Sequence, residues 1–212
     1  MGLMEIRRRV LMASKKRLPS AYQEVEYIEK TARKSYIKTG VIGNGELLFT
    51  CKMMITTVNN GAPFFGSYGN SQRCYFLIQN NDDKIGCSYI TTDYADTVLT
   101  KDVIYDVIVD FKVGEQKLTI NGVDVLNTSK QNALHTGREL YLFGYNFDGN
   151  FDENRSSYIK LYSATITQDG VLVRNFVPCY RKADGEIGMY DTVAKIFYTN
   201  AGTDAFTKGA DV

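Results

Sequence analysis

The stretch IYDVIVDFKVGEQKLTINGVDVLN, residues 104–127, carries the pattern that decides the fold. In its first half every second residue is apolar and shares one face of an extended strand, namely Tyr105, Val107, Val109, Phe111 and Val113. Gly114 permits a turn, and Leu118 and Ile120 resume the alternation. Asn121-Gly122 then predicts a type I′ turn, because both central residues of that turn need positive φ. The stretch therefore predicts consecutive antiparallel strands joined by hairpins.

The same period of two recurs along the chain, in segments that are bounded by Gly, Asn, Asp or Pro. These segments are residues 46–58, 73–79, 84–92, 139–146, 157–167 and 171–180. About ten short strands need two packed sheets or a closed barrel to hide their inward faces. We expect an all-β fold, a two-sheet antiparallel jelly-roll sandwich.

Composition excludes several classes of function. The chain has 212 residues and a formal net charge of +1, so no global field draws it to nucleic acid or to an anionic membrane, and neither is an expected partner. The four cysteines, Cys51, Cys74, Cys87 and Cys179, form no C-x-x-C pair, and His135 is the single histidine. Three of them lie in alternating apolar runs such as Cys74, Phe76 and Ile78, which predicts buried thiols. We expect no metal and no cofactor.

The first 18 residues form a basic arm that differs from the rest of the chain. We expect a short helix over residues 3–17, with Leu3, Ile6 and Val10 on one side and Arg7, Arg8 and Arg9 elsewhere. So short a helix is marginal alone, so it either packs on a partner or remains a frayed, solvated tail. The arm has no apolar core of a signal peptide, and no later segment approaches a membrane span. We therefore expect synthesis in a bacterial cytoplasm without a signal peptide.

Three glutamates raise the question of glycan hydrolysis. Glu24, Glu26 and Glu29 have the spacing E-V-E-Y-I-E, close to the E-x-D-x-x-E acid trio of some β-sheet glucanases. In a regular strand Glu24 and Glu26 share a face and Glu29 has the opposite parity, so the three carboxyl groups would not converge. The chain also has no tryptophan to serve as a sugar platform. We interpret the trio as a solvated strand face and expect no enzyme.

Aromatic residues in predicted loops are candidates for binding sugars, which stack on aromatic faces and need amide or carboxylate partners for their hydroxyls. The alternative is that these tyrosines cap the ends of sheets. The segment DGNFDENR, residues 148–155, begins like a calcium loop but lacks the glycine and glutamate that such a loop requires, which favours a polar hairpin tip. The candidate ligand-binding residues are Tyr68, Tyr94, Tyr145, Phe147, Asp148, Asn150 and Phe151.

Both ends of the domain resemble a known family. LPSAYQEVEYIE (residues 18–29), YIKTG (residues 36–40) and the segment from Leu161 to Gly209, above all FVPCYR (176–181) and GMYD (188–191) with Phe197-Tyr198, resemble concanavalin A-like, laminin-G-like jelly-roll domains. Such domains are found in phage and prophage proteins and in surface proteins of Firmicutes. The resemblance covers residues 18–209. Where the family has a small, polar S-T-G-T-Q step, this chain has KTARKS at residues 30–35.

The resemblance implies a sandwich with a binding or structural role, and it supplies no catalytic residue. We expect an arm at residues 1–18 and a jelly-roll domain at residues 19–212 that ends in a hairpin region at 181–212. The leading hypothesis is a non-enzymatic phage or prophage virion surface protein that decorates the particle or binds host surface glycan. Its partners would be a capsid or tail protein, or copies of itself, reached through the arm. The alternatives are a bacterial carbohydrate-binding adhesin module and a glycan hydrolase.

Overall fold

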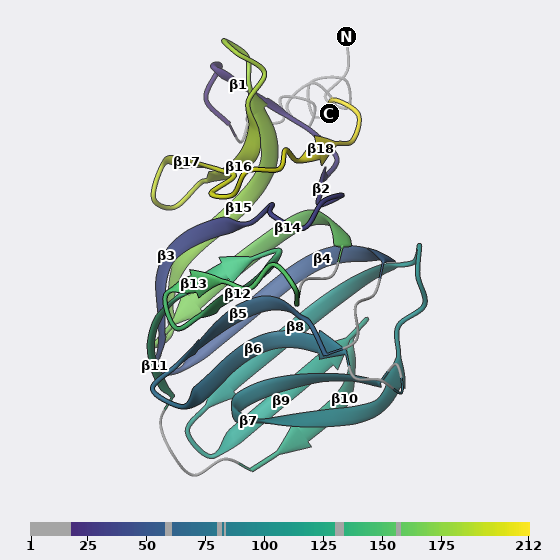
Figure 1. The fold of residues 1–212 in the computed structure, drawn as a ribbon, viewed down its shortest axis with the longest axis vertical. Coiled ribbons are helices and arrows are strands. Elements are labelled where there is room, and N and C mark those ends of the chain that lie inside the picture. Colours follow the sequence, from purple (N-terminus) through teal and green to yellow (C-terminus); the bar gives the residue numbers. More distant parts are fainter. Residues whose placement is uncertain (1–17, 58–60, 80–81, 83, 130–133, 156–157) are drawn as a thin grey trace, which may run out of the picture.

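Two β-sheets make up the computed structural model, which describes residues 18–57, 61–79, 82, 84–129, 134–155 and 158–212 (Figure 1). The expected all-β sandwich of two antiparallel sheets is confirmed, with one parallel pair, β12 with β5. The helix expected at residues 3–17, with Leu3, Ile6, Val10 and the arginines Arg7, Arg8 and Arg9, lies outside the described residues. No membrane-spanning helix occurs in the described ranges.

The larger sheet contains eleven strands and is centred on a pair that is distant in sequence, β4 with β14. Met54 of β4 pairs with Lys160 of β14, and β1 pairs with β15. The order along the sheet is β10 (Val123–Thr128), β9 (Glu115–Ile120), β8 (Ile104–Lys112), β4 (Leu47–Thr57), β14 (Tyr158–Gln168), β15 (Val171–Arg181), β16 (Ile187–Asp191) and β17 (Ile196–Thr199), with β1 (Tyr22–Glu24), β2 (Ile28–Glu29) and β18 (Thr207–Lys208) attached beside β14 and β15.

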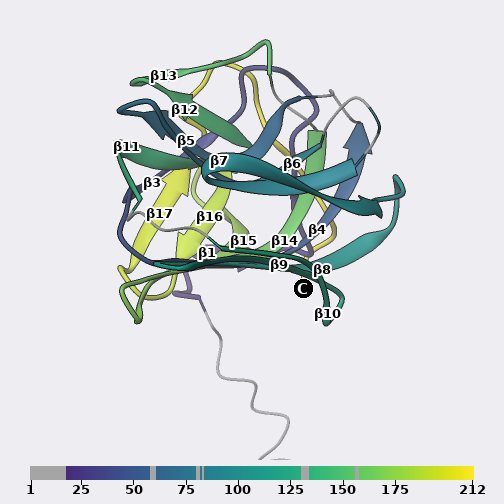
Figure 2. The same cartoon turned by 90° about the horizontal axis from the view of Figure 1, so that it is seen from below.

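The smaller sheet contains seven strands and lies over the larger one, as Figure 2 shows for β6 and β7 opposite β8 and β9. Its centre is β5, which pairs with β6, β11 and β12. The strands are β3 (Ile37–Asn44), β5 (Pro63–Gly69), β6 (Gln72–Gln79), β7 (Lys84–Val98), β11 (His135–Leu142), β12 (Gly144–Phe147) and β13 (Asn150–Phe151).

The stretch 104–127 folds into the predicted hairpins β8, β9 and β10 of the larger sheet. Asn121 and Gly122 have φ of 50° and 80°, as the type I′ prediction requires. Val113 is a correction: β8 ends at Lys112, and Val113 is 55% exposed in the turn before Gly114. The alternating sequence pattern therefore continues one residue beyond the end of the strand.

The core lies between the two sheets and is rich in aromatic contacts. Phe49 of β4 stacks on Phe76 of β6 with a centroid distance of 4.5 Å, and Phe76 also contacts Phe111 of β8. All four cysteines are buried and unpaired, as expected. Ile78 is a second correction: a register shift between Tyr75 and Ile78 moves its side chain out of the main core and onto the other face of β6. Strand alternation fails at such a bulge because the extra residue inverts the parity.

The glutamate trio does not lie on one regular strand. The chain forms β1 up to Glu24, bridges to Asp211 at Val25 and forms β2 at Ile28–Glu29 after a bend at Glu26. Of the three, Glu26 is exposed, whereas Glu24 and Glu29 are half-buried.

The two ends of the described chain meet at this place. The backbone N–H of Val212 donates to the carbonyl of Glu24 at 3.0 Å. Leu18, the last residue of the expected arm, is itself buried beside Val177 and Tyr190. Leu18 therefore packs with the domain.

Candidate functional site

The outer face of the seven-stranded sheet carries two rows of side chains that cross β12, β5 and β6. In one row Phe147 pairs with Tyr68, which pairs with Arg73. In the other row Tyr145 pairs with Gly66, which pairs with Tyr75. Residues in register on neighbouring strands lie on the same face, so the register gathers these side chains. We call Tyr68, Tyr75, Tyr145 and Phe147 the aromatic cluster.

The aromatic rings of this cluster form a continuous chain of contacts. Tyr68 stacks on Phe147 at 5.1 Å, Phe147 meets Tyr145 edge-on at 6.1 Å, and Tyr145 meets Tyr75 edge-on at 5.2 Å. Tyr145 and Tyr75 are almost fully buried, whereas the Phe147 side chain is 47% exposed. Phe147 thus presents an apolar face to solvent, and the buried tyrosines fix its position.

Gly66 lies between the two buried tyrosines in the strand register. Its φ is 142°, and a Cβ at this position would lie 2.0 Å from the backbone carbonyl oxygen of Cys74. No L-residue fits there without movement of β6. Gly66 therefore lets the backbones of β5 and β6 approach closely at the point where Tyr145 and Tyr75 meet.

A depression of about 510 Å³ lies beside the aromatic cluster. One side of it is formed by β7. Within this strand Ile90 has a φ of 71°, and the hydroxyl groups of Ser88 and Thr92 on either side of it form a hydrogen bond of 2.7 Å. The lining residues of this depression, which we call the tyrosine–arginine pocket, are Gly61, Pro63, Arg73, Tyr75, Ile78, Thr91, Thr92, Tyr94, Tyr145 and Arg155.

The pocket carries positive charge. Among its described lining residues Arg73 and Arg155 are basic and none is acidic. Burial raises the pKa of Tyr75 to about 12, although both guanidinium groups act in the opposite direction. The pKa of Tyr145 is also raised, first by burial and then by its hydrogen bond to Asp152 at 2.9 Å. Both phenols therefore stay protonated at neutral pH and act as hydrogen-bonding groups.

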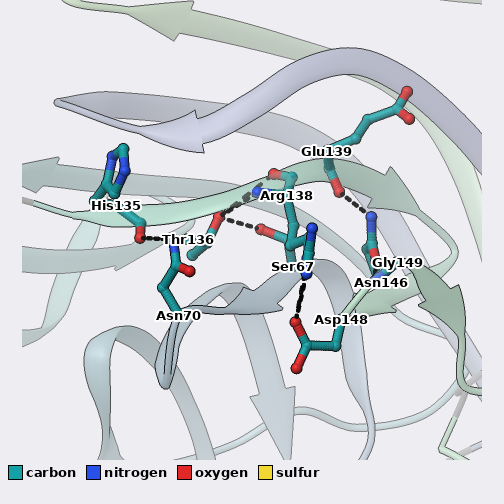
Figure 3. A network of polar contacts seen from close by, with 9 residues as sticks. All are labelled: Ser67, Asn70, His135, Thr136, Arg138, Glu139, Asn146, Asp148 and Gly149. Carbon is teal, nitrogen blue, oxygen red and sulfur yellow. Dashed lines mark hydrogen bonds and ion pairs between the residues drawn. The ribbon is translucent and has the colours of Figure 1, made fainter.

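The hairpin of β12 and β13 is held by a polar network (Figure 3). Arg138 of β11 donates from Nε and Nη2 to Oδ1 of Asp148, at 3.2 and 2.9 Å. Asn146 donates to the carbonyl of Glu139 and accepts from the backbone N–H of Gly149. The φ of 50° at Asp148 is one that aspartate tolerates in a tight turn. This network fixes the strand from which Tyr145 and Phe147 project.

The structure brings together some of the predicted binding residues and separates others. Tyr94, which is 38% exposed, and Tyr145 line the pocket, and Tyr68 and Phe147 belong to the adjacent cluster. Asp148 and Asn150 are exposed at the hairpin tip, where the Asp148 carboxylate is engaged by Arg138.

Phe151 belongs to a different environment. Its ring stacks on Tyr36 at 4.1 Å with an interplanar angle of 4°. Nζ of Lys30 lies 4.8 Å from its centroid. Lys30 is fully buried, and its Nζ donates to the carbonyl of Phe143 at 2.7 Å. Burial lowers the pKa of Lys30 to about 7, and the negative charge of Asp204 partly offsets this effect.

Sequence reasoning predicted only Tyr94 and Tyr145 among the pocket residues, and the polar residues that it missed are Arg73, Tyr75, Thr91, Thr92 and Arg155. The first two were detectable, because Cys74 and Phe76 point into the core and their neighbours must therefore point outward. Arg155 had no such signal, since its position depends on the direction in which the β12–β13 hairpin sends the chain. Within the described residues no group of three or more His, Cys, Asp or Glu side chains could hold a metal ion.

No protein-family model matches the sequence, and no curated protein matches it. The similarities are to solved structures. A protein from Bacteroides ovatus that is proposed to bind carbohydrate matches with a TM-score of 0.58 and 11% identity, over 90% of this chain and 62% of that one. The chain therefore spans less than two thirds of the length of that protein.

Two further matches have lower scores. The heptameric pentraxin of Limulus polyphemus matches with a TM-score of 0.49 and 11% identity, over 68% of this chain and 74% of that one. The sialidase of Trypanosoma rangeli matches with a TM-score of 0.45 and 11% identity, over 57% of this chain and 20% of that one. At such identities the similarity to the Bacteroides protein shows the fold alone, which fits the concanavalin A-like resemblance and carries no link to a phage or a Firmicutes protein.

Proposed function

We propose that this protein is a non-enzymatic carbohydrate-binding module whose site is the tyrosine–arginine pocket with the adjoining aromatic cluster. The observation that carries the proposal is that the exposed ring of Tyr94 lines one depression together with hydrogen-bonding groups, while the exposed ring of Phe147 lies in the adjoining aromatic cluster. Sugar rings stack on aromatic faces and take up hydrogen bonds from planar and hydroxyl groups. The fold shared with a Bacteroides protein proposed to bind carbohydrate supports the same reading.

The polar groups of the pocket suit a ligand that is rich in hydroxyls. Thr91 and Thr92 come from β7, Arg73 comes from β6, and Arg155 follows the β12–β13 hairpin. These residues lie in strands or follow the β12–β13 hairpin, which the hydrogen bonds of Arg138 and Asn146 hold in place. Their positions are therefore set before a ligand binds. Preorganised groups cost little conformational entropy on binding.

Binding without chemistry is the function that this pocket supports best. Hydrolysis of a glycoside in most families needs two carboxyl groups on either side of the scissile bond. No described lining residue is a carboxylate, and Asp152 behind the pocket accepts the hydrogen bond of Tyr145. A tyrosine whose pKa is raised by burial is a poor nucleophile at neutral pH.

Tyr94→Ala tests the proposal, because Tyr94 is exposed enough for its loss to leave the fold intact. Tyr145→Ala is unsuitable as a test, since Tyr145 is buried and its removal would damage the sheet. We expect binding found for the wild type on an array of bacterial and host glycans to weaken about fivefold in Tyr94→Ala, from the loss of about 1 kcal/mol of stacking.

Tyr162→Ala is the matched control, since Tyr162 packs on Tyr27 over the other sheet. The proposal fails if the wild type binds no glycan, or if Tyr94→Ala and Tyr162→Ala bind as the wild type does.

The virion hypothesis enters this proposal only through the arm. Attachment to a capsid or tail protein, or to copies of the chain, would have to use residues 1–17, which lie outside the described residues. We prefer the carbohydrate-binding alternative over particle decoration because the pocket and the fold support it. Attachment through the arm stays a prediction.

A further inference from the structure

We propose that the tyrosine–arginine pocket binds an acidic saccharide, a sugar ring that carries a carboxylate or a sulfate group received by Arg73 and Arg155. This inference rests on the proposed function, because it names the class of sugar that the same site would take. It depends on the positive charge of the two guanidinium groups, because a neutral sugar has no anionic group to pair with that charge.

Arg73 and Arg155 reach the pocket from different elements. Arg73 lies in β6, in register with Tyr68 of β5 on one side and Ile90 of β7 on the other. Arg155 follows β13, and its backbone N–H donates to the carbonyl of Asp152 at 3.3 Å. The positive charge of Arg73 acts on Tyr75 and Tyr94, and that of Arg155 acts on Tyr75 and Tyr145. Both charges thus converge on the phenols that line the same depression.

Three other arginines of the described chain each pair with a carboxylate. Arg138 pairs with Asp148, Arg174 with Asp191 and Arg181 with Asp184. Among the residues that the structure describes, Arg73 and Arg155 make no salt bridge with a carboxylate.

The acids closest to the pocket in the chain are already engaged. Asp152 accepts the hydrogen bond of Tyr145, Glu153 pairs with Lys34 at 3.2 Å, and Asp93 accepts from Gln116 and Thr128. Two guanidinium groups without an acidic neighbour in the lining leave a local positive charge on a chain that is nearly neutral overall.

A guanidinium group binds carboxylate and sulfate oxygens well, because its donors form a fork that matches two oxygen atoms of one anionic group. The exposed ring of Tyr94 lines the same pocket as the two arginines. A charged monosaccharide unit can therefore stack on the ring while its anionic group meets the arginines. A free anion without a sugar ring would use the charge and leave the aromatic face unused.

Titration calorimetry with matched ligands tests the inference. The first pair is tetragalacturonate and its methyl ester, which share the sugar ring and differ in charge. A heparin-derived tetrasaccharide is the second acidic ligand and distinguishes a preference for sulfate from one for carboxylate. We expect an acidic ligand to bind at least about tenfold more tightly than the methyl ester, as charge-assisted hydrogen bonds predict.

Arg73→Gln and Arg155→Gln should each remove about tenfold of the affinity for the acidic ligand and leave binding of the methyl ester unchanged. Lys38→Gln is the matched control, since Lys38 is an exposed cation of the same sheet outside the pocket lining. This variant should bind the acidic ligand with the affinity of the wild type.

The outcomes separate this inference from the proposed function. Equal affinity for acid and ester, with a loss in Tyr94→Ala, would overturn the acidic preference and preserve carbohydrate binding. An equal loss in Lys38→Gln would show attraction by general charge and would also overturn the inference. Binding of no saccharide at all would overturn both.

Discussion

Replacing Lys30 by methionine should make the stability of this protein less dependent on pH. Lys30 is fully buried, and burial lowers the pKa of its amine from the ordinary value of 10.5 to about 7. Between these two pH values the unfolded chain binds a proton that the folded chain does not. The free energy of unfolding of the wild type therefore gains a contribution that rises with pH through this window. Methionine fills a similar volume and cannot titrate.

The size of the effect follows from the shift in pKa. A lowering from 10.5 to about 7 corresponds to roughly 5 kcal/mol of lost stability when the lysine is fully protonated. Between pH 6 and pH 9 about 3 kcal/mol of this penalty should disappear in the wild type. The variant also leaves the carbonyl of Phe143 without the Lys30 donor, which costs about 1–3 kcal/mol at every pH. The change with pH, and not the absolute stability, is therefore the informative quantity.

Urea unfolding followed by circular dichroism at pH 6, 7, 8 and 9, with a reductant present, measures this quantity. The difference in free energy of unfolding, wild type minus Lys30→Met, should rise by about 3 kcal/mol across the series. Buried cysteines and tyrosines also titrate at high pH, but they contribute equally to both proteins and cancel in the difference. Lys38→Met removes the same charge from an exposed site and corrects for the change in net charge.

Parallel stability curves of wild type and Lys30→Met from pH 6 to pH 9 would refute the reasoning. Such a result would mean that the amine reaches water in the folded protein, or that the ring of Phe151 and the charge of Asp204 hold it protonated.

Two further predictions concern the frame around the pocket. Gly66→Ala should lower the free energy of unfolding by at least about 2 kcal/mol, because the added Cβ meets the backbone oxygen of Cys74. Gly114→Ala is the control: Gly114 also has a positive φ but has open space around it, so this variant should lose less stability in the same urea titration. Removal of residues 1–17 with retention of Leu18 should leave the melting temperature unchanged, since the described core begins at Leu18, and unfolding of the truncated protein would show that the arm belongs to the core.

Strand alternation predicted most of the fold, because half-buried strands alternate wherever the pairing is regular. It failed where the pairing is irregular. At Val113 the strand had already ended, and at Ile78 a register shift inverted the parity. Neither event has a sequence signal of its own, since it results from how β6 and β8 match their partner strands.

The candidate site was less predictable than the fold. The prediction of loop aromatics is wrong for all five residues, since they lie in strands: Tyr68, Tyr94, Tyr145, Phe147 and Phe151. Tyr145 reaches the pocket through the register of β12, and Tyr94 reaches it through the course of β7 past Ile90. Phe151 lies in the same polar, glycine-containing segment as Tyr145, residues 144–154, but its ring packs near Lys30 and not in the pocket. The family resemblance differs at KTARKS, and the first residue of that segment is the buried lysine. A polar environment for Lys30 depends on Phe143 and Asp204, more than one hundred residues away in sequence.

The central pair of the larger sheet has a consequence for the order of folding during synthesis. Met54 of β4 pairs with Ile104 of β8 on one edge and with Lys160 of β14 on the other, 106 residues after Met54. At a translation rate of about 5–20 residues per second, the second partner is made about 5–20 s after β4. The meander of β8, β9 and β10 is complete long before then and can cover one edge of β4. The other edge of β4 has unsatisfied backbone groups until β14 is made. A chain whose synthesis ends before residue 158 would therefore have an open sheet edge and would be prone to aggregate.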